Sequence, residues 1–148
     1  MAAMAVVPDV MMKKVEWHLA HAEAEAEKLR RELKELEREV TDLHSPGTEP
    51  RRGSGVSDPT ARAAQRLASA RERLENSERW GAVVLRTRAH FEGAPEGVVF
   101  DLTYAQHMTQ QDAAELLGVD RQTVRRHRET IVVFAALIAA ERGLIRME

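Results

Sequence analysis

Apolar side chains recur along the first third of this sequence at alternating steps of three and four residues, from Met12 to Leu43. This spacing places a single apolar seam along a helix, kept here for more than four heptads, with Glu, Lys and Arg filling most other positions. Asp9 stands near the start, where negative charge suits the helix dipole, and Ser45-Pro46-Gly47 is expected to stop the helix. The pattern predicts one long coiled-coil-forming helix over residues 8–44. We expect oligomerisation through its larger seam residues, which are Val15, Leu19, Leu29, Leu33, Leu36, Val40 and Leu43.

The composition favours packed helices. Hydrophobic residues make up 43% of the 148 residues but aromatic residues only 4%, and because much of the apolar share is Ala, side chains that fill a thick core are scarce. The chain has no Cys, which excludes a disulfide framework, an iron–sulfur cluster, a thiolate nucleophile and a Cys-containing zinc site. We therefore predict an all-α protein without a cofactor.

A break in composition follows the first helix. Residues 45–58 are rich in Pro, Gly and Ser and are predicted to form a flexible linker. Its two cationic residues, Arg51 and Arg52, either belong to a solvated loop or form an arm that touches the DNA backbone. Pro59, preceded by a capping pair, predicts the start of the next helical segment, over 59–93. Its apolar stripe is built mostly from Ala, and Asn76-Ser77 is expected to cap a fresh helix within it. The stripe either folds back on the first helix as a hairpin or joins a bundle of several chains.

The charge is unevenly distributed. The formal net charge is only −2, yet residues 59–93 hold seven basic residues, all Arg, against four acidic ones. A nearly neutral total therefore hides basic surfaces able to meet phosphate.

The strongest motif lies between Thr109 and Arg128, in the predicted C-terminal domain over 94–148. A helix-turn-helix needs a small contact between its two helices, a Gly in a left-handed turn, and apolar residues at fixed offsets. Ala113 and Ala114 supply the small contact and Gly118 the turn. Thr109 and Asp120 can cap the two helices, and three residues are expected in the core, namely Leu117, Val119 and Val124.

The outward face of the second helix is basic, and the first residues of a recognition helix are where base contacts fall. Arg pairs bidentately with guanine and Gln with adenine, so Arg121, Gln122 and Arg125 are predicted to contact bases. Contacts to phosphate are predicted for Gln110, Thr123, Arg126 and Arg128. The expected partner is double-stranded DNA, and the competing interpretation is an ordinary helical corner with a solvated Arg face.

An apolar run, Ile131–Ala140, follows directly. A helix that is apolar on nearly all sides must be buried. It either packs under Trp80, Val84, Phe91 and Val99 as core of the C-terminal domain or forms a subunit interface.

Upstream of the motif, Leu102-Thr103-Tyr104 and Met108-Thr109 resemble region 4 of bacterial sigma factors in sequence and spacing. That pattern usually has a Gly where this chain has His107 and a Glu where it has Asp112. The whole layout resembles the ArpU/RinA-like family of phage transcriptional regulators. The shared features are the heptad helix, the Gly–Ser–Val–Ser–Asp junction, a second helix, and a DNA-reading segment, here called the reader, at Leu102–Arg128. The resemblance implies activation of late phage genes, with RNA polymerase as a candidate partner.

Two further function classes remain open. A small terminase subunit, which recognises viral DNA for packaging, also joins a helix-turn-helix to helical oligomerisation segments, although it usually places the reader first. A coiled-coil adaptor would make the basic face incidental. We expect a homodimer before a larger homo-oligomer, because pairing doubles the base contacts.

Other chemistry finds little support in the sequence. His18, His21 and Glu25 have a helical spacing that can hold a metal, but such a pair is far more often a solvated face, and no metal site is predicted. No nucleophile–base set or phosphate loop stands out, so no enzyme is expected. Met1–Val7 is too short for a signal peptide and Ile131–Ala140 too short to span a bilayer, which predicts a cytoplasmic protein of a bacterial host with no membrane partner.

Overall fold

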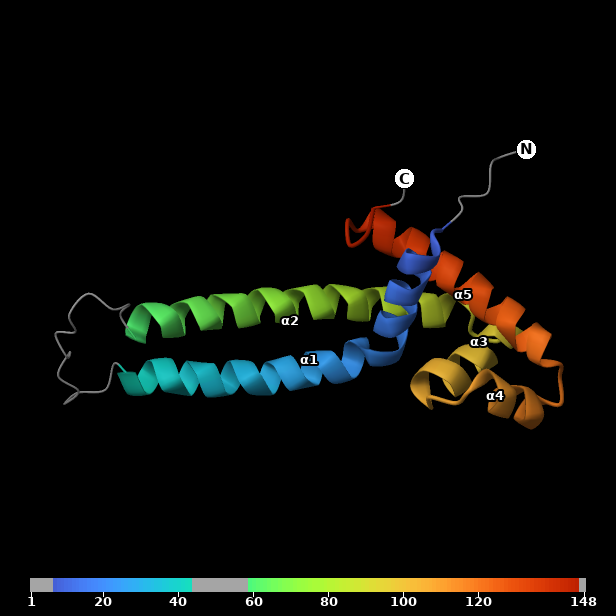
Figure 1. Ribbon diagram of the computed structural model, residues 1–148, viewed down its shortest axis with the longest axis horizontal. Helices are drawn as coiled ribbons and strands as arrows, with labels where there is room; N and C mark the ends of the chain where they lie inside the picture. Colours follow the sequence, from blue (N-terminus) through green and yellow to red (C-terminus); the bar gives the residue numbers. More distant parts are fainter. Residues whose placement is uncertain (1–6, 44–58, 147–148) are drawn as a thin grey trace. The chain divides into compact units, whose positions relative to one another are not determined.

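The computed structural model of the chain describes residues 7–43 and 59–146, and every regular element in these ranges is helical. The all-α prediction is confirmed. The elements are α1 (Asp9–Leu43), α2 (Pro59–His90), α3 (Pro95–Phe100), the π-helical η1 (Asp101–Ala105), α4 (Gln110–Leu117) and α5 (Arg121–Glu141) (Figure 1). The predicted linker, with Arg51 and Arg52, lies outside the described residues. No helix in the described ranges combines the length and the apolar character needed to cross a membrane.

The contacts divide the chain into two compact units, to which both α1 and α2 contribute. Unit 1 comprises Met1–Glu23 and Arg79–Glu148, and unit 2 comprises Ala24–Glu78.

In unit 2, α1 and α2 run antiparallel along each other. Ion pairs of 3.5–3.8 Å between the helices set the register, and residue numbers fall along α2 as they rise along α1: Arg30–Glu78, Glu32–Arg73, Glu37–Arg71 and Glu39–Arg66. This register brings Leu36 level with Ala70, and Ala26, Leu29, Ala63 and Ala70 are buried. The hairpin within one chain is therefore the arrangement that the structure shows. Of the residues predicted to oligomerise, Val15, Leu19 and Leu29 are buried within the chain itself. Assembly of several chains through the remaining seam residues stays a prediction.

The helix restart at Asn76-Ser77 is wrong, because α2 runs without interruption from Pro59 to His90. Ser77 is only 5% exposed and follows Ala63 and Ala70 at steps of seven residues. It is therefore the next small residue of the buried seam, not a cap.

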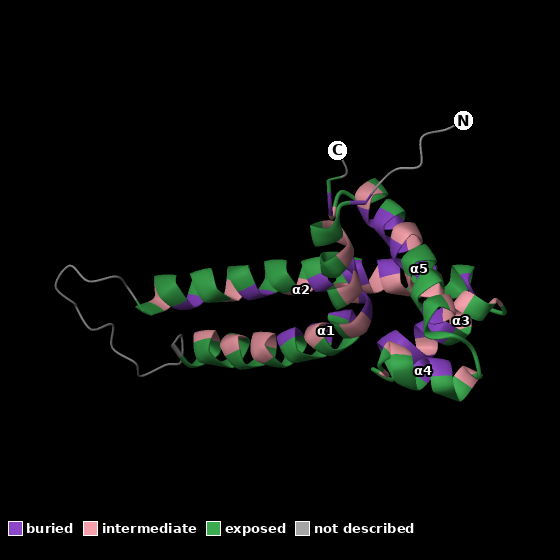
Figure 2. Ribbon diagram, turned by 45° about the vertical axis from the view of Figure 1, so that its right-hand side comes forward, coloured by how far each residue is buried: buried purple, intermediate pink, exposed green. Residues whose placement is uncertain are grey.

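The core of unit 1 is built around the second half of α5. Ile131, Val132, Ala135 and Ala136 are fully buried, and they belong to one apolar cluster with residues of five other elements, α1, α2, α3, η1 and α4. Figure 2 shows buried positions in purple along α5. That cluster includes Val15, Leu19, Trp80, Val83, Phe91, Val99 and Phe100, with Val84 packed against it. Apart from Leu137, which is 43% exposed, the Ile131–Ala140 run thus packs in the core of unit 1 with Trp80, Val84, Phe91 and Val99, as the first of the two alternatives expected. A helix with so little polar surface is stable only when covered.

Candidate nucleic-acid interface

The chain reverses direction at a capped corner between α4 and α5. At the start of α4, Thr109 Oγ1 accepts a hydrogen bond from the Asp112 N–H at 3.1 Å. At its end Gly118 is in the left-handed region, with φ of 65°, and the Val119 N–H donates to the Ala114 oxygen at 3.1 Å, which is the Schellman pattern. Asp120 then caps α5, its Oδ1 accepting from the Gln122 N–H at 3.4 Å. These local bonds fix where α5 begins.

The inner side of the corner is closed by small side chains. Ala113, Ala114 and Val124 are all buried in the same cluster, as the motif requires, and Leu117 is packed against it. Val119 differs from the prediction, because it is 41% exposed. Its backbone N–H closes the turn, while the apolar contact from α5 is supplied by Val124.

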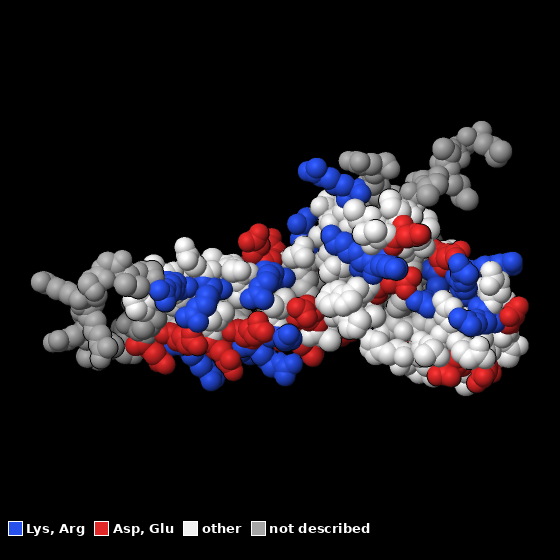
Figure 3. Space-filling view, viewed as in Figure 1, with Lys and Arg blue, Asp and Glu red and all other residues white. Residues whose placement is uncertain are grey.

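The outer side of α5 presents three Arg residues and one Gln in its first two turns. Arg121, Gln122, Arg125 and Arg126 are all exposed. At about 100° per residue they span an arc of roughly 140°, on the side of the helix away from Val124. Basic side chains accordingly gather over the start of α5, at the right of Figure 3.

A hollow of about 610 Å³ lies beside this face. It is lined by Gln110 of α4 together with Asp120, Arg121, Gln122 and Arg125. Four of the predicted DNA contacts, from two helices, are thus brought together at one concave place. Thr123 is half-buried and does not line this hollow.

The cations of this face are available to a ligand. Within the described part of the chain, neither Arg121 nor Arg126 has an ion pair, and Arg125 pairs only with Glu129, Nε to Oε1 at 3.3 Å. Both side chains of that pair are more than half exposed. Such surface pairs contribute less than about 1 kcal/mol, so a phosphate or a base edge can replace Glu129 at little cost.

Arg128 requires a correction. Its guanidinium donates through Nη2 to Glu16 Oε2 and through Nε to Tyr104 Oη, the latter at 3.5 Å. Its side chain is only 22% exposed, and its charge lies 5.6 Å from the centre of the Tyr104 ring. Arg128 therefore joins α1, η1 and α5 inside unit 1, and we remove it from the predicted phosphate contacts.

Burial changes the titration of this cluster. Burial raises the pKa of Tyr104 to about 12, and the nearby Glu16 carboxylate adds to the increase against the opposing effect of Arg128. Burial also works against the charge of Arg128, but its interactions with Tyr104 and Glu16 outweigh this effect and raise its pKa. Tyr104 is therefore neutral and Arg128 charged at neutral pH.

His107, just before α4, has a left-handed backbone conformation. It is the non-glycine residue with positive φ, 57°, among those described, directly before the segment that leads into α4. The sigma-factor pattern usually has a Gly here, and a left-handed conformation is the physical reason for that preference.

His18 and His21, which were expected to form a solvated face and no metal site, pack against aromatic rings. His18 stacks on Trp80 with ring centroids 3.9 Å apart, and His21 stacks on Trp17 at 4.9 Å. Burial, with smaller effects from Lys14 and His21, lowers the pKa of His18 to about 4. A neutral ring against indole is what this geometry stabilises.

Comparisons with known proteins give no independent identification, since no family model, no curated protein and no solved structure matches this chain.

Proposed function

We propose that this chain is a sequence-specific DNA-binding protein that inserts the start of α5 into the major groove. The observation that supports this most directly is the exposed face formed by Arg121, Gln122, Arg125 and Arg126 beside the hollow at Gln110. An α-helix fits the width of the major groove, and its first residues reach the base edges.

The residue types fit base recognition. Arg121 and Arg125 each offer a bidentate donor pair to guanine, and the Gln122 amide both donates to and accepts from adenine. Gln110 opens α4, where free backbone N–H groups also favour phosphate, and Arg126 lies at the edge of the exposed arc. We assign these last two to the backbone, with Thr123 as a neighbouring contact.

We further propose that the biological role is transcriptional regulation in a phage or prophage, as an activator of late genes that acts as an oligomer. This role rests on the sequence resemblance to ArpU/RinA-like regulators. The positive φ of His107 fits the resemblance of residues 102–128 to sigma-factor region 4, which usually has a Gly at this position. A single reader offers few base contacts, so several copies on one DNA would supply the affinity.

The test is selection of bound DNA from a random pool by the full chain, followed by binding isotherms on the enriched sequence. Each bidentate base contact contributes about 1–3 kcal/mol of discrimination. The double variant Arg121→Ala/Arg125→Ala should therefore lose about 30-fold or more in affinity for the enriched site and much less for random DNA.

A matched control removes two exposed Arg residues elsewhere, Arg31→Ala/Arg86→Ala, neither of which has an ion pair in the described ranges. This control should retain the affinity for the enriched site. Failure of the pool to enrich any sequence, or equal binding by both double variants, would count against the proposal.

A further inference from the structure

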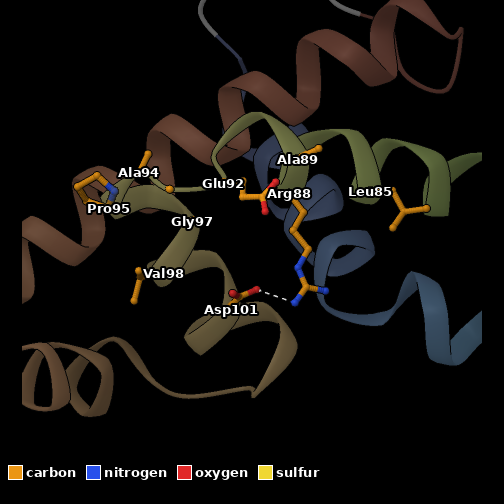
Figure 4. Close-up of a pocket in the computed structure, with 10 residues that line it drawn as sticks. Leu85, Arg88, Ala89, Glu92, Ala94, Pro95, Gly97, Val98 and Asp101 are labelled. Atoms are coloured by element: carbon orange, nitrogen blue, oxygen red, sulfur yellow. Dashed lines mark ion pairs between the residues drawn. The ribbon is translucent and has the colours of Figure 1, made fainter.

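A groove of about 640 Å³ runs along unit 1 at the end of α2. Two exposed apolar side chains stand on its opposite sides, Leu85 of α2, 69% exposed, and Val98 of α3, 47% exposed (Figure 4). Ala89, Ala94 and Pro95 complete its apolar lining. An apolar partner surface could bury both side chains at once, because they stand on opposite sides of the same groove.

The groove is acidic on balance. Arg88 and Asp101 lie between the two apolar sides, Nη2 to Oδ1 at 3.0 Å, and Glu92 adds a carboxylate without an ion pair in the described part of the chain (Figure 4). The Asp101 Oδ1 atom is buried, yet the approach of Arg88 does not have hydrogen-bond geometry. A cation from outside the groove would find the Glu92 carboxylate there and the exposed part of the Asp101 side chain, which is 45% exposed.

The complementary surface lies on the first turns of α1, also in unit 1. Val10 is 78% exposed and Trp17 46% exposed, and Lys13 and Lys14 lie between them in sequence. At about 100° per residue these four residues share an arc of roughly 100°, opposite the buried Val15. We call this set the basic stripe.

We propose that the basic stripe of one copy of this chain docks in the Leu85–Val98 groove of a second copy. Val10 and Trp17 would cover the apolar sides of the groove, while Lys13 and Lys14 reach Glu92 and Asp101. No ion pair in the described ranges joins this stripe to the groove of its own chain, and both surfaces belong to the same compact unit. The inference concerns assembly and does not depend on DNA binding.

The two surfaces are different patches, so each contact joins one stripe to one groove. Two copies can exchange both contacts in a two-fold dimer, or the contact can repeat head-to-tail, which either closes a ring or extends an open chain. A two-fold dimer through one self-complementary patch would behave differently, which makes the geometry testable by mixing variants.

The experiment measures the mass of the full chain by sedimentation at micromolar concentration. We expect wild type to exceed the 16.6 kDa protomer. A stripe variant, Val10→Glu/Lys13→Glu, and a groove variant, Leu85→Glu/Glu92→Lys, should each sediment as the protomer. An equimolar mixture of the two should form a dimer and nothing larger, because it contains one intact stripe and one intact groove per pair.

The matched control is Lys28→Glu/Leu137→Glu, which changes one exposed Lys and one exposed apolar residue outside both surfaces. It should keep the wild-type mass, and circular dichroism should show native helix content for every variant. Three results would overturn the proposal: a protomeric wild type, unchanged mass in a folded stripe or groove variant, or a mixture that stays protomeric.

Discussion

The two halves of α5 share a helical backbone but differ in burial and in charge. In the segment Arg121–Arg126 only Val124 is buried, whereas the segment Ile131–Ala139 has six buried residues and no charged one. The second half anchors the helix in the core of unit 1, and this anchoring allows the first half to present charge to solvent without loss of position. A recognition surface needs such rigid support, because binding strength depends on groups held in place beforehand.

Arg128 marks the boundary between these halves. It follows Val124 by four residues and precedes Ile131 by three, so it lies on the inner side of the helix although its residue type matches the outer side. Its bonds to Glu16 and Tyr104 satisfy the guanidinium within the protein. Stability and proposed recognition therefore divide by helix face, and not by residue type.

The largest effect on stability is expected when a cavity is made in the buried second half of α5. Ile131→Ala removes a fully buried side chain and should lower the free energy of unfolding by about 2–5 kcal/mol, through lost transfer energy and the cavity left behind. Urea unfolding monitored by circular dichroism measures this change. Arg126→Ala in the exposed half is the control and should stay within about 0.5 kcal/mol of wild type. Similar losses in both variants would remove the distinction between the halves.

The boundary residue should behave as part of the core. Arg128→Met keeps the stem but removes the charge, which leaves Glu16 and Tyr104 without their donor, and we expect a loss of about 1–3 kcal/mol in unfolding free energy. Arg126→Met, the same change on the outer face, should alter stability little. If Arg128→Met were as stable as wild type but failed to bind the selected DNA, Arg128 would return to the proposed DNA contacts.

The turn between α4 and α5 can be tested by comparing two glycines that differ in the sign of φ. A Cβ at Gly118 or at Gly81 would meet no atom within 4 Å, but only Gly118 has positive φ. Gly118→Ala should therefore cost about 1–2 kcal/mol in strain, and Gly81→Ala, inside α2, should gain up to about 1 kcal/mol in helix propensity. Thermal melts would show shifts of opposite sign. A shift of the same sign for both would mean that the turn does not require its left-handed residue.

Much of the corner was predictable because its determinants are local in sequence. Thr109, Gly118 and Asp120 act on backbone groups within a few residues, and the buried apolar run after the corner follows from its composition alone. The fully buried Val124 was predictable for the same reason.

What could not be predicted depends on distant partners. Glu16 lies 112 residues from Arg128, and no local pattern joins them. The register against Val124 and Ile131 was a usable sign that Arg128 faces inward, and the repeat of Ala63, Ala70 and Ser77 was a sign that α2 continues. Val119 was wrongly predicted to lie in the core, because its position in the motif does not determine whether the side chain after the turn points inward or to solvent. The pairing of α1 with α2 in one chain was one of two open alternatives, since a heptad seam does not specify its partner.

The smallest expected effect on stability concerns His18, which lies against the core of unit 1. His18 lies against Trp80, which belongs to the same core cluster as Ile131, and burial lowers its folded-state pKa from 6.5 to about 4. Because the folded state holds the neutral form, the contribution of His18 to stability is complete above the unfolded pKa and is lost as pH falls from 6.5 towards 4. One proton sets an upper limit of about 1.4 kcal/mol per pH unit, and the half-exposed position of the ring reduces the expected slope well below that limit.

The measurement is the free energy of unfolding against pH for wild type and for His18→Gln. His90→Gln is the control, because His90 also stacks on an aromatic ring, at 4.0 Å from Phe134, but is exposed. The slope should decrease in His18→Gln and persist in His90→Gln. Equal slopes in all three proteins would show that the His18 ring is as well solvated as the exposed side chains at the start of α5.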